Sequence, residues 1–172
     1  SHPRVLCYRD YMAWNLMIDP AGDLRLLDYQ DMLLGSPAYD LITLLNDRDI
    51  DLALGRENWL KLAGYAMAQP GLDSRDRLLE CALQRDLRLA GQFWNLSQVR
   101  GKPHYETWVP GCLKRIGRSL AGLKRWPKVL AKLSGFSQDI RTGAADPWLS
   151  PAPAGRLRVD ENLERSLAVE RH

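Results

Sequence analysis

The chain has 172 residues, 45% of them apolar and 26% charged, and these fractions are ordinary for one soluble globular domain. Its formal net charge of +3 is too small an excess to indicate nucleic-acid binding. No apolar run approaches the length of a membrane span, and the first residues lack the plan of a secretory signal. We therefore expect neither nucleic acid nor a membrane as a partner.

The three cysteines, Cys7, Cys81 and Cys112, are odd in number and widely spaced. This pattern fits neither a disulfide framework nor a metal site, and it indicates a reducing compartment. We expect a cytoplasmic protein.

Two short apolar runs near the start of the chain predict a β-hairpin. They cover 16–18 (LMI) and 24–27 (LRLL), and the residues between them include Pro20 and Gly22, which are typical of a turn. A short strand over 4–7 leads into this region. The hairpin would bring Asn15 and Asp28 together, because they lie at its two open ends.

Asp10, Asn15 and Asp28 form the candidate site. A carboxylate and an amide oxygen side by side suit Mg²⁺, which prefers oxygen ligands. Asp10, in the loop that leads into the hairpin, would face the same place and could accept a proton from a hydroxyl nucleophile. Protein kinases use this layout of one catalytic Asp and two metal-binding side chains.

Three segments in register resemble the aminoglycoside phosphotransferase and choline kinase-like family, which has a protein-kinase-like fold. Residues 8–10 (YRD) followed by Asn15 resemble the H-R-D-x-x-x-x-N catalytic loop. Residues 28–31 (DYQD) resemble the metal-binding segment, and residues 35–41 (GSPAYDL) resemble the run that follows it. Within the family, the chain is most similar to bacterial amino-sugar kinases of the N-acetylmuramate/N-acetylglucosamine type.

The resemblance implies the chemistry. Asp10 would be the catalytic base, Asn15 and Asp28 would hold Mg²⁺, and ATP would be the phosphate donor. The full-length protein would transfer the γ-phosphate of ATP to a hydroxyl of a sugar or amino sugar.

Four further residues are predicted to support this site. The resemblance implies that the carboxylate of Asp40 hydrogen-bonds the backbone of the catalytic loop, although a plain charge in the first turn of a helix is the alternative. Tyr8 replaces the usual His and would pack behind the loop. Arg9 would pair with an acid or a phosphate, and Asp31 would support the substrate site. Met12 replaces a second common His, which leaves the substrate class and the substrate-binding residues open.

Helical periodicity organises the rest of the chain. After a loop over 31–37, it predicts helices over 38–46, 56–68, 73–98, 105–124 and 126–133. The polar joint at 47–51 and a basic stripe within 114–125 are expected to be solvated.

The longest predicted helix has a buried and an exposed face. Leu87 and Trp94 fall on the face that is expected to be buried. Arg85, Asp86 and Arg88 fall mostly on the opposite, exposed face.

These elements predict a mainly α fold with a small β-hairpin, the C-terminal lobe of a protein-kinase-like phosphotransferase. Residues 1–135 would form the lobe, with the catalytic loop and metal-binding hairpin in 5–31 and the helical part in 38–133. Residues 136–172 would form a Pro/Ala/Gly-rich linker and a charged tail. The strand lysine that the N-terminal lobe of a kinase supplies has no counterpart here. We therefore expect the chain to be inactive alone and to have the missing N-terminal lobe of the same protein as its partner.

Two other classes of function stay open. One is a non-catalytic, pseudokinase-like scaffold. The other is a kinase of the same family that acts on choline, homoserine or an aminoglycoside. Choline would call for an aromatic cage. An aminoglycoside would call for an acidic rim, for which Asp47, Asp49 and Asp51 are the only cluster.

Overall fold

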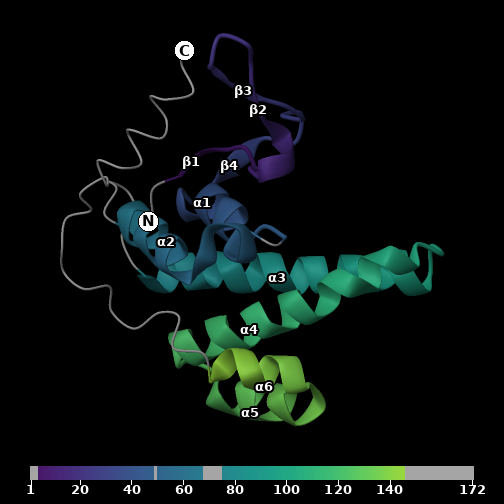
Figure 1. Cartoon of the computed structure of the whole chain (residues 1–172). Coiled ribbons are helices and arrows are strands. Elements are labelled where there is room, and N and C mark those ends of the chain that lie inside the picture. The colour runs from purple at the N-terminus through teal and green to yellow at the C-terminus, as the bar shows by residue number, and fades with distance from the viewer. Residues whose placement is uncertain (1–3, 49, 68–74, 146–172) are drawn as a thin grey trace.

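Helices form most of the molecule, and the strands gather at one end of it (Figure 1). The structure is a computed structural model, and it describes residues 4–48, 50–67 and 75–145. The elements follow one another as β1 (Val5–Cys7), the 3₁₀ helix η1 (Ala13–Asn15), β2 (Leu16–Ile18), β3 (Leu24–Leu26), β4 (Leu33–Gly35), α1 (Ala38–Leu45), α2 (Ile50–Met67), α3 (Arg75–Gln98), the 3₁₀ helix η2 (Pro103–Trp108), α4 (Val109–Leu123), α5 (Pro127–Phe136) and α6 (Gln138–Ala144). The mainly α fold with a small hairpin is confirmed.

The hairpin forms where the sequence predicts it. Strands β2 and β3 pair in antiparallel fashion, with Leu16 opposite Leu26. The carboxylate of Asp19 closes the turn by accepting hydrogen bonds from the backbone N–H groups of Ala21 and Asp23, each at 2.9 Å. Gly22 has a φ of 86°, a left-handed conformation that glycine adopts without a steric cost.

Strand β4 lies where the sequence predicted only a loop. It pairs in antiparallel fashion with β1, and Leu6 lies opposite Leu34. A three-residue strand with a distant partner carries too short a pattern to be recognised in the sequence. The pair joins the two sides of the hairpin region, so the segment before Asp10 and the segment after Asp28 are held together.

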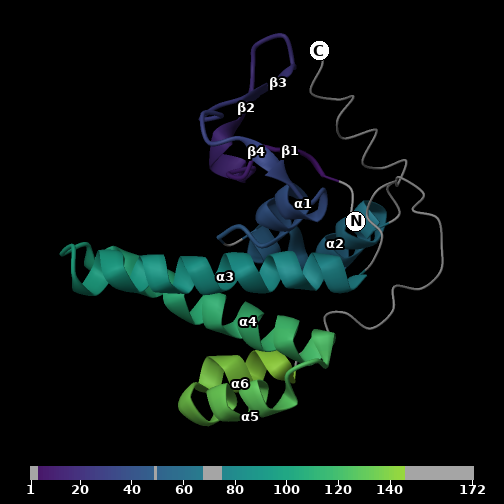
Figure 2. The same cartoon turned by 180° about the vertical axis from the view of Figure 1, so that it is seen from behind.

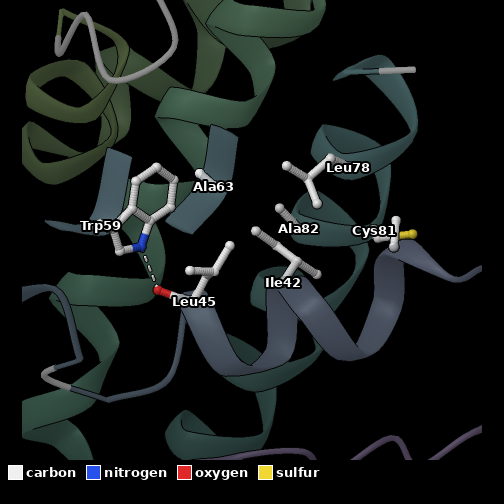
Figure 3. Close-up of a cluster of buried hydrophobic side chains, with 8 residues drawn as sticks. Ile42, Leu45, Trp59, Ala63, Leu78, Cys81 and Ala82 are labelled. Atoms are coloured by element: carbon white, nitrogen blue, oxygen red, sulfur yellow. Dashed lines mark hydrogen bonds between the residues drawn. The ribbon is translucent and has the colours of Figure 1, made fainter. Parts of the chain in front are cut away.

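Helices α1, α2 and α3 share a core of buried apolar side chains (Figure 3). Ile42 and Leu45 of α1 pack with Leu78 and Ala82 of α3, and Trp59 of α2 joins them. The indole Nε1 of Trp59 donates a hydrogen bond to the backbone oxygen of Leu45 at 2.6 Å, so its polar atom is satisfied inside the core. This packing fixes α1, the helix that follows the strands, on the longest helix of the molecule.

Helix α2 contains a break at Gly55, whose φ is 70° and ψ is 159°. The regular segment after the break begins at Arg56, the residue where the sequence predicted the helix to start. The predicted end at Ala68 lies outside the described residues.

Helices α5 and α6 lie against α4 on the side away from the strands (Figures 1 and 2). The predicted lobe boundary at residue 135 is therefore too early, because α6 (Gln138–Ala144) packs against α4 and buries Ile140. The hydroxyl of Ser137 caps α6 by accepting a hydrogen bond from the backbone N–H of Ile140. The remainder of the predicted tail, 146–172, lies outside the described residues.

Two glycines permit the close approach of α4 and α6. A Cβ on Gly117 would lie 2.0 Å from the backbone oxygen of Ile140, and one on Gly143 would lie 1.8 Å from that of Lys114. We expect Gly117→Ala to lower the free energy of unfolding by about 1–3 kcal/mol, because the helices must separate. Urea denaturation followed by circular dichroism measures this.

Gly91→Ala is the matched control, because a Cβ on Gly91 in α3 meets nothing within 4 Å. This change is expected to be neutral or to stabilise the protein by about 0.5–1 kcal/mol. Equal unfolding free energies for Gly117→Ala and the unchanged protein would contradict the close packing of α4 and α6.

The predicted exposure of the charged side chains on α3 and α4 is partly wrong. Arg85 and Asp86 have relative exposures of only 2% and 0%, and Arg118 is also buried. The Nε of Arg115 lies 2.9 Å from Oδ1 of Asp86, and Nη1 of Arg85 lies 3.8 Å from the same oxygen. A carboxylate between two guanidiniums permits burial that an isolated charge would not tolerate.

Candidate active site

The loop between β1 and β2, which the sequence predicts to be the catalytic loop, is held by the first turn of α1. The carboxylate of Asp40 accepts hydrogen bonds from the backbone N–H groups of Tyr8 at 2.6 Å and of Arg9 at 2.8 Å. Arg9 has a φ of 73°, in the left-handed region that is unfavourable for a side chain with a Cβ. The two charge-assisted bonds offset this cost and fix the backbone directly before Asp10.

Asp47, which directly follows the C-cap of α1, holds the other half of the loop. One oxygen of its carboxylate accepts a hydrogen bond from the backbone N–H of Ala13 at 3.1 Å, and the other accepts from that of Arg48 at 2.8 Å. Asp47 is only 2% exposed, so the expectation of a solvated joint is wrong for this residue. Asp49 and the side chain of Asp51 lie outside the described residues.

Sequence reasoning missed this role of Asp47. The available signal was its position. Asp40 lies in the first turn of α1 and Asp47 lies just after its C-cap, so a carboxylate at each end of the helix binds the same loop. Helix α1 thereby clamps the catalytic loop at two points.

Asn15 joins the loop to the hairpin. Its side-chain Nδ2 donates a hydrogen bond to the backbone oxygen of Asp10 at 2.9 Å, and its backbone oxygen accepts one from the N–H of Leu27 at 2.9 Å. The register of the hairpin therefore sets Asn15 beside the residue that precedes Asp28. The three oxygen-bearing residues that the sequence selected lie around one end of the hairpin.

Tyr8 is close to several negatively charged side chains of the candidate site. Burial raises the pKa of its hydroxyl, and the negative charges of Asp28, Asp10 and Asp40 raise it further. Its side chain is buried, and its hydroxyl has no hydrogen-bond partner within the part of the chain that the structure describes. The carboxylates of Asp28, Asp10 and Asp40 therefore lie around the ring of Tyr8.

Asn15 and Asp28, the predicted metal ligands, each keep a side-chain oxygen that could bind a magnesium ion. The Nδ2 of Asn15 donates to the backbone oxygen of Asp10, and the Oδ1 accepts no hydrogen bond from the described residues. One oxygen of Asp28 accepts a hydrogen bond from the side chain of Gln30, which leaves the other for a ligand. Asp28 also has a φ of 64°, a conformation that is rare outside turns and special sites.

No group of three or more His, Cys, Asp or Glu side chains is arranged for a metal among residues 4–48, 50–67 and 75–145. One carboxylate and one amide oxygen are a sparse set of protein ligands. Mg²⁺ is commonly bound in this way, because it keeps water molecules and takes phosphate oxygens as its other ligands.

A cavity of about 340 Å³ opens beside Asp10. Asp10 and Arg9 line it from the loop, the segment after α1 closes one side, and α3 forms the opposite wall. Tyr105 of η2 and Arg115 of α4 complete it. Its volume lies in the range of small-molecule sites.

The predicted supporting residues Arg9 and Asp31 also line this cavity. The Nη1 of Arg9 donates a hydrogen bond to the backbone oxygen of Asp31 at 3.4 Å, so the two segments meet at its edge. The side chains of α3 in the cavity were not predicted. Arg85 and Arg88, three residues apart and therefore on one face of the helix, were the available signal.

Arg48, which lines the cavity, also contacts two tryptophan rings that do not line it. The guanidinium of Arg48 lies 6.0 Å from the ring centre of Trp14 and 5.6 Å from that of Trp108. Contacts of this kind are attractive because the face of an indole is negative. They hold Arg48 at the mouth of the catalytic loop.

The fold is consistent with a mainly α lobe of the protein-kinase-like phosphotransferases, in which the short helix α1 holds the backbone of the loop before the β2–β3 hairpin. Residues 1–81 match the phosphotransferase enzyme family. The resemblance that the sequence motifs indicated is thereby confirmed.

Curated relatives extend the similarity beyond residue 81. The chain is 32% identical to the N-acetylmuramate/N-acetylglucosamine kinase of Neisseria meningitidis serogroup B, over 83% of this chain and 46% of the relative. It is 35% identical to the kinase of the same name from Caulobacter vibrioides, over 71% of this chain and 37% of the relative. The kinase of that name from Pseudomonas putida is 29% identical over 84% of this chain and 43% of the relative. The chain thus spans less than half the length of these relatives, and no solved structure matches it.

Proposed function

We propose that this chain is the C-terminal lobe of an ATP-dependent kinase that phosphorylates a hydroxyl of an amino sugar, of the N-acetylmuramate or N-acetylglucosamine kind. The observation that carries the proposal is the position of Asp10, on a loop fixed by Asp40 and at the wall of a cavity of small-molecule size. The relatives that share most of this chain bear the name of such kinases. ATP as donor and the three free thiols support the cytoplasm as the location.

In the reaction, Asp10 orients the acceptor hydroxyl and takes its proton. The hydroxyl oxygen bonds to the γ-phosphorus of ATP while the bond from that phosphorus to ADP breaks. Asn15 and Asp28 would hold Mg²⁺, which neutralises the charge of the transferring phosphoryl group. Catalysis depends on positioning, so the contacts from α1 to the loop belong to the mechanism.

The strand end of the lobe is a docking surface for the N-terminal lobe of the same protein. Leu6, Ile18 and Leu34 have exposures of 64%, 65% and 66%, although each lies on a strand. A group of exposed apolar side chains on short strands indicates a surface that another part of a protein covers. A kinase binds ATP between two lobes. Strands β1 and β2, which carry Leu6 and Ile18, flank the predicted catalytic loop and lie at one end of the molecule (Figure 2).

The structure disfavours two of the alternative acceptors. The aromatic side chains that line the cavity are Phe93 and Tyr105, which pack on each other with their ring centres 5.7 Å apart, and Trp14 and Trp108 contact Arg48, so these rings are not arranged as an open cage for choline. Asp47 is buried against the catalytic loop and does not form an acidic rim for an aminoglycoside. The surplus of arginine in the cavity would also repel a polycation.

The test of the proposal is an acceptor panel with the whole protein, both lobes present. N-acetylmuramate, N-acetylglucosamine, homoserine, choline and an aminoglycoside are incubated with ATP and Mg²⁺, and the products are identified by mass spectrometry. We expect a phosphate to be added to an amino sugar. Phosphorylation of none of the five would support a scaffold instead, and phosphorylation of homoserine alone would assign a different acceptor.

Asp40→Asn is expected to lower kcat by about 10–100-fold, because a shifted loop misplaces the catalytic carboxylate. An amide offers only one acceptor oxygen, so it does not bind both the N–H of Tyr8 and the N–H of Arg9. Steady-state kinetics of the whole protein measures this effect.

Asp139→Asn makes the same charge change in the first turn of α6 and is the control. Its kcat is expected to stay within about 2-fold of the parent, since surface substitutions have small effects. An equally small effect of Asp40→Asn would favour the helix-charge interpretation of Asp40 over the loop-holding one.

A further inference from the structure

The wall of the cavity that faces Asp10 carries an excess of positive charge. Among the described residues that line the cavity there are three aspartates and five arginines; the arginines are Arg9, Arg48, Arg85, Arg88 and Arg115. This excess is greatest on the helical side of the cavity, which the sequence predicted to be solvent-facing.

Four of these arginines already have partners. Arg85 and Arg115 share the carboxylate of Asp86, which lies behind the cavity wall. Arg48 lies 3.9 Å from Asp47, and Arg9 donates to the backbone of Asp31. Two guanidiniums on one carboxylate leave the α3 and α4 side of the wall with a net positive charge.

Arg88 is different from these four. It is exposed, it lines the cavity one helical turn from Arg85, and it makes no hydrogen bond or ion pair with any residue that the structure describes. A planar guanidinium with free donors beside a positively charged wall is suited to bind a carboxylate in a bidentate manner. The apolar side chains of Leu89 and Phe93 follow on the same helix and offer a surface for the rest of a small ligand.

We propose that Arg88 binds the carboxylate of an acidic amino sugar and so determines acceptor specificity, an inference that rests on the proposed function. N-acetylmuramate carries a carboxylate on its lactyl ether, and N-acetylglucosamine carries none. A hydroxyl near Asp10 and a carboxylate near Arg88 would orient the acidic sugar across the cavity. The neutral sugar lacks this second point of attachment and therefore binds more weakly.

The test measures kcat/KM of the whole protein for N-acetylmuramate and for N-acetylglucosamine. We expect the parent to prefer the acidic sugar, and Arg88→Gln to lower the ratio of the two values by about 10–100-fold through KM for the acidic sugar. Arg88→Lys, which keeps the charge but loses the bidentate fork, is expected to give an intermediate ratio. The ratio does not depend on the amount of folded enzyme, so a partly misfolded variant still yields a valid result.

Arg77→Gln is the control, because Arg77 lies on the same helix, pairs with Glu80 and does not line the cavity. Its ratio is expected to equal that of the parent. If both sugars are phosphorylated and Arg88→Gln leaves their ratio unchanged, the role of Arg88 is overturned while the proposed function stands. If the parent phosphorylates neither sugar, the proposed function fails, and the inference fails with it.

Discussion

Replacing Asp10 by asparagine is expected to lower kcat of the whole protein by about 10²–10⁴-fold, the usual contribution of a positioned acid or base. The amide has the same shape as the carboxylate but does not accept the proton of the acceptor hydroxyl. The backbone oxygen of Asp10 keeps its hydrogen bonds from Met12 and Asn15, so the loop keeps its conformation. Steady-state turnover of ATP with an amino sugar measures the effect.

Asp23→Asn provides a matched control for Asp10→Asn. Asp23 lies in the turn of the hairpin, and its exposed carboxylate lies 3.4 Å from Arg25. The same loss of charge at this position is expected to change kcat by less than about 2-fold. A kcat for Asp10→Asn equal to that of the parent would remove Asp10 from the mechanism.

The sequence predicts the catalytic loop and the hairpin well because their determinants are local. Gly22 and Asp19 specify the turn within a few residues. The position of Asp40 in the first turn of α1 also follows from local periodicity, and its two hydrogen bonds to the loop agree with what the motif implies. The loop, the hairpin and the position of Asp40 can therefore be predicted from short motifs with fixed spacing.

Long-range partners are the part that periodicity does not predict. Strand β4 is defined by its pairing with β1, almost thirty residues earlier, and α6 is defined by the fit of Gly143 against the backbone of Lys114. Strand β4 has three residues and α6 has seven, so neither is long enough to show a clear hydrophobic periodicity. Both elements are stabilised by contacts with distant parts of the chain, and these contacts cannot be read from the local sequence.

Charge on α3 illustrates the same limit. Helical periodicity predicted Leu87 and Trp94 to be buried, but both are exposed, while Arg85 and Asp86 are buried. The error has a physical cause: Asp86 meets Arg115 of α4 and Asn46, which follows α1. Charged side chains with such partners behave as core residues, so apolar character alone gives the wrong face of the helix.

The acceptor cavity could not be predicted for a related reason. It is lined by the catalytic loop, the segment after α1, α3, η2 and α4, which are separated by long stretches of chain. The resemblance to the family motifs predicted the reacting side chains, but it did not predict the residues that line the rest of the cavity. Only the packing of α3 and α4 beneath the loop brings Arg88 and Arg115 into the same space as Asp10.

The arginine wall also depends on one buried carboxylate. Asn46 donates a hydrogen bond from Nδ2 to Oδ2 of Asp86 at 3.3 Å, and Arg115 binds the other oxygen. Burial lowers the pKa of the Arg85 guanidinium, and the charge of Asp86 opposes that shift. Asp86 therefore stabilises the positive charge that the cavity displays.

Asp86→Asn is expected to lower the free energy of unfolding by about 3–5 kcal/mol, because it leaves two arginines in or near the core without their counter-charge. The control is Asp76→Asn on the same helix, whose carboxylate pairs with Arg125 at 3.0 Å on the surface. Its cost is expected to be below about 1 kcal/mol, since exposed ion pairs contribute little. Chemical denaturation of the three proteins gives the comparison. If the two variants unfold at the same denaturant concentration, the buried charge is not what fixes α4 against α3, and the apolar contacts of these helices must do so instead.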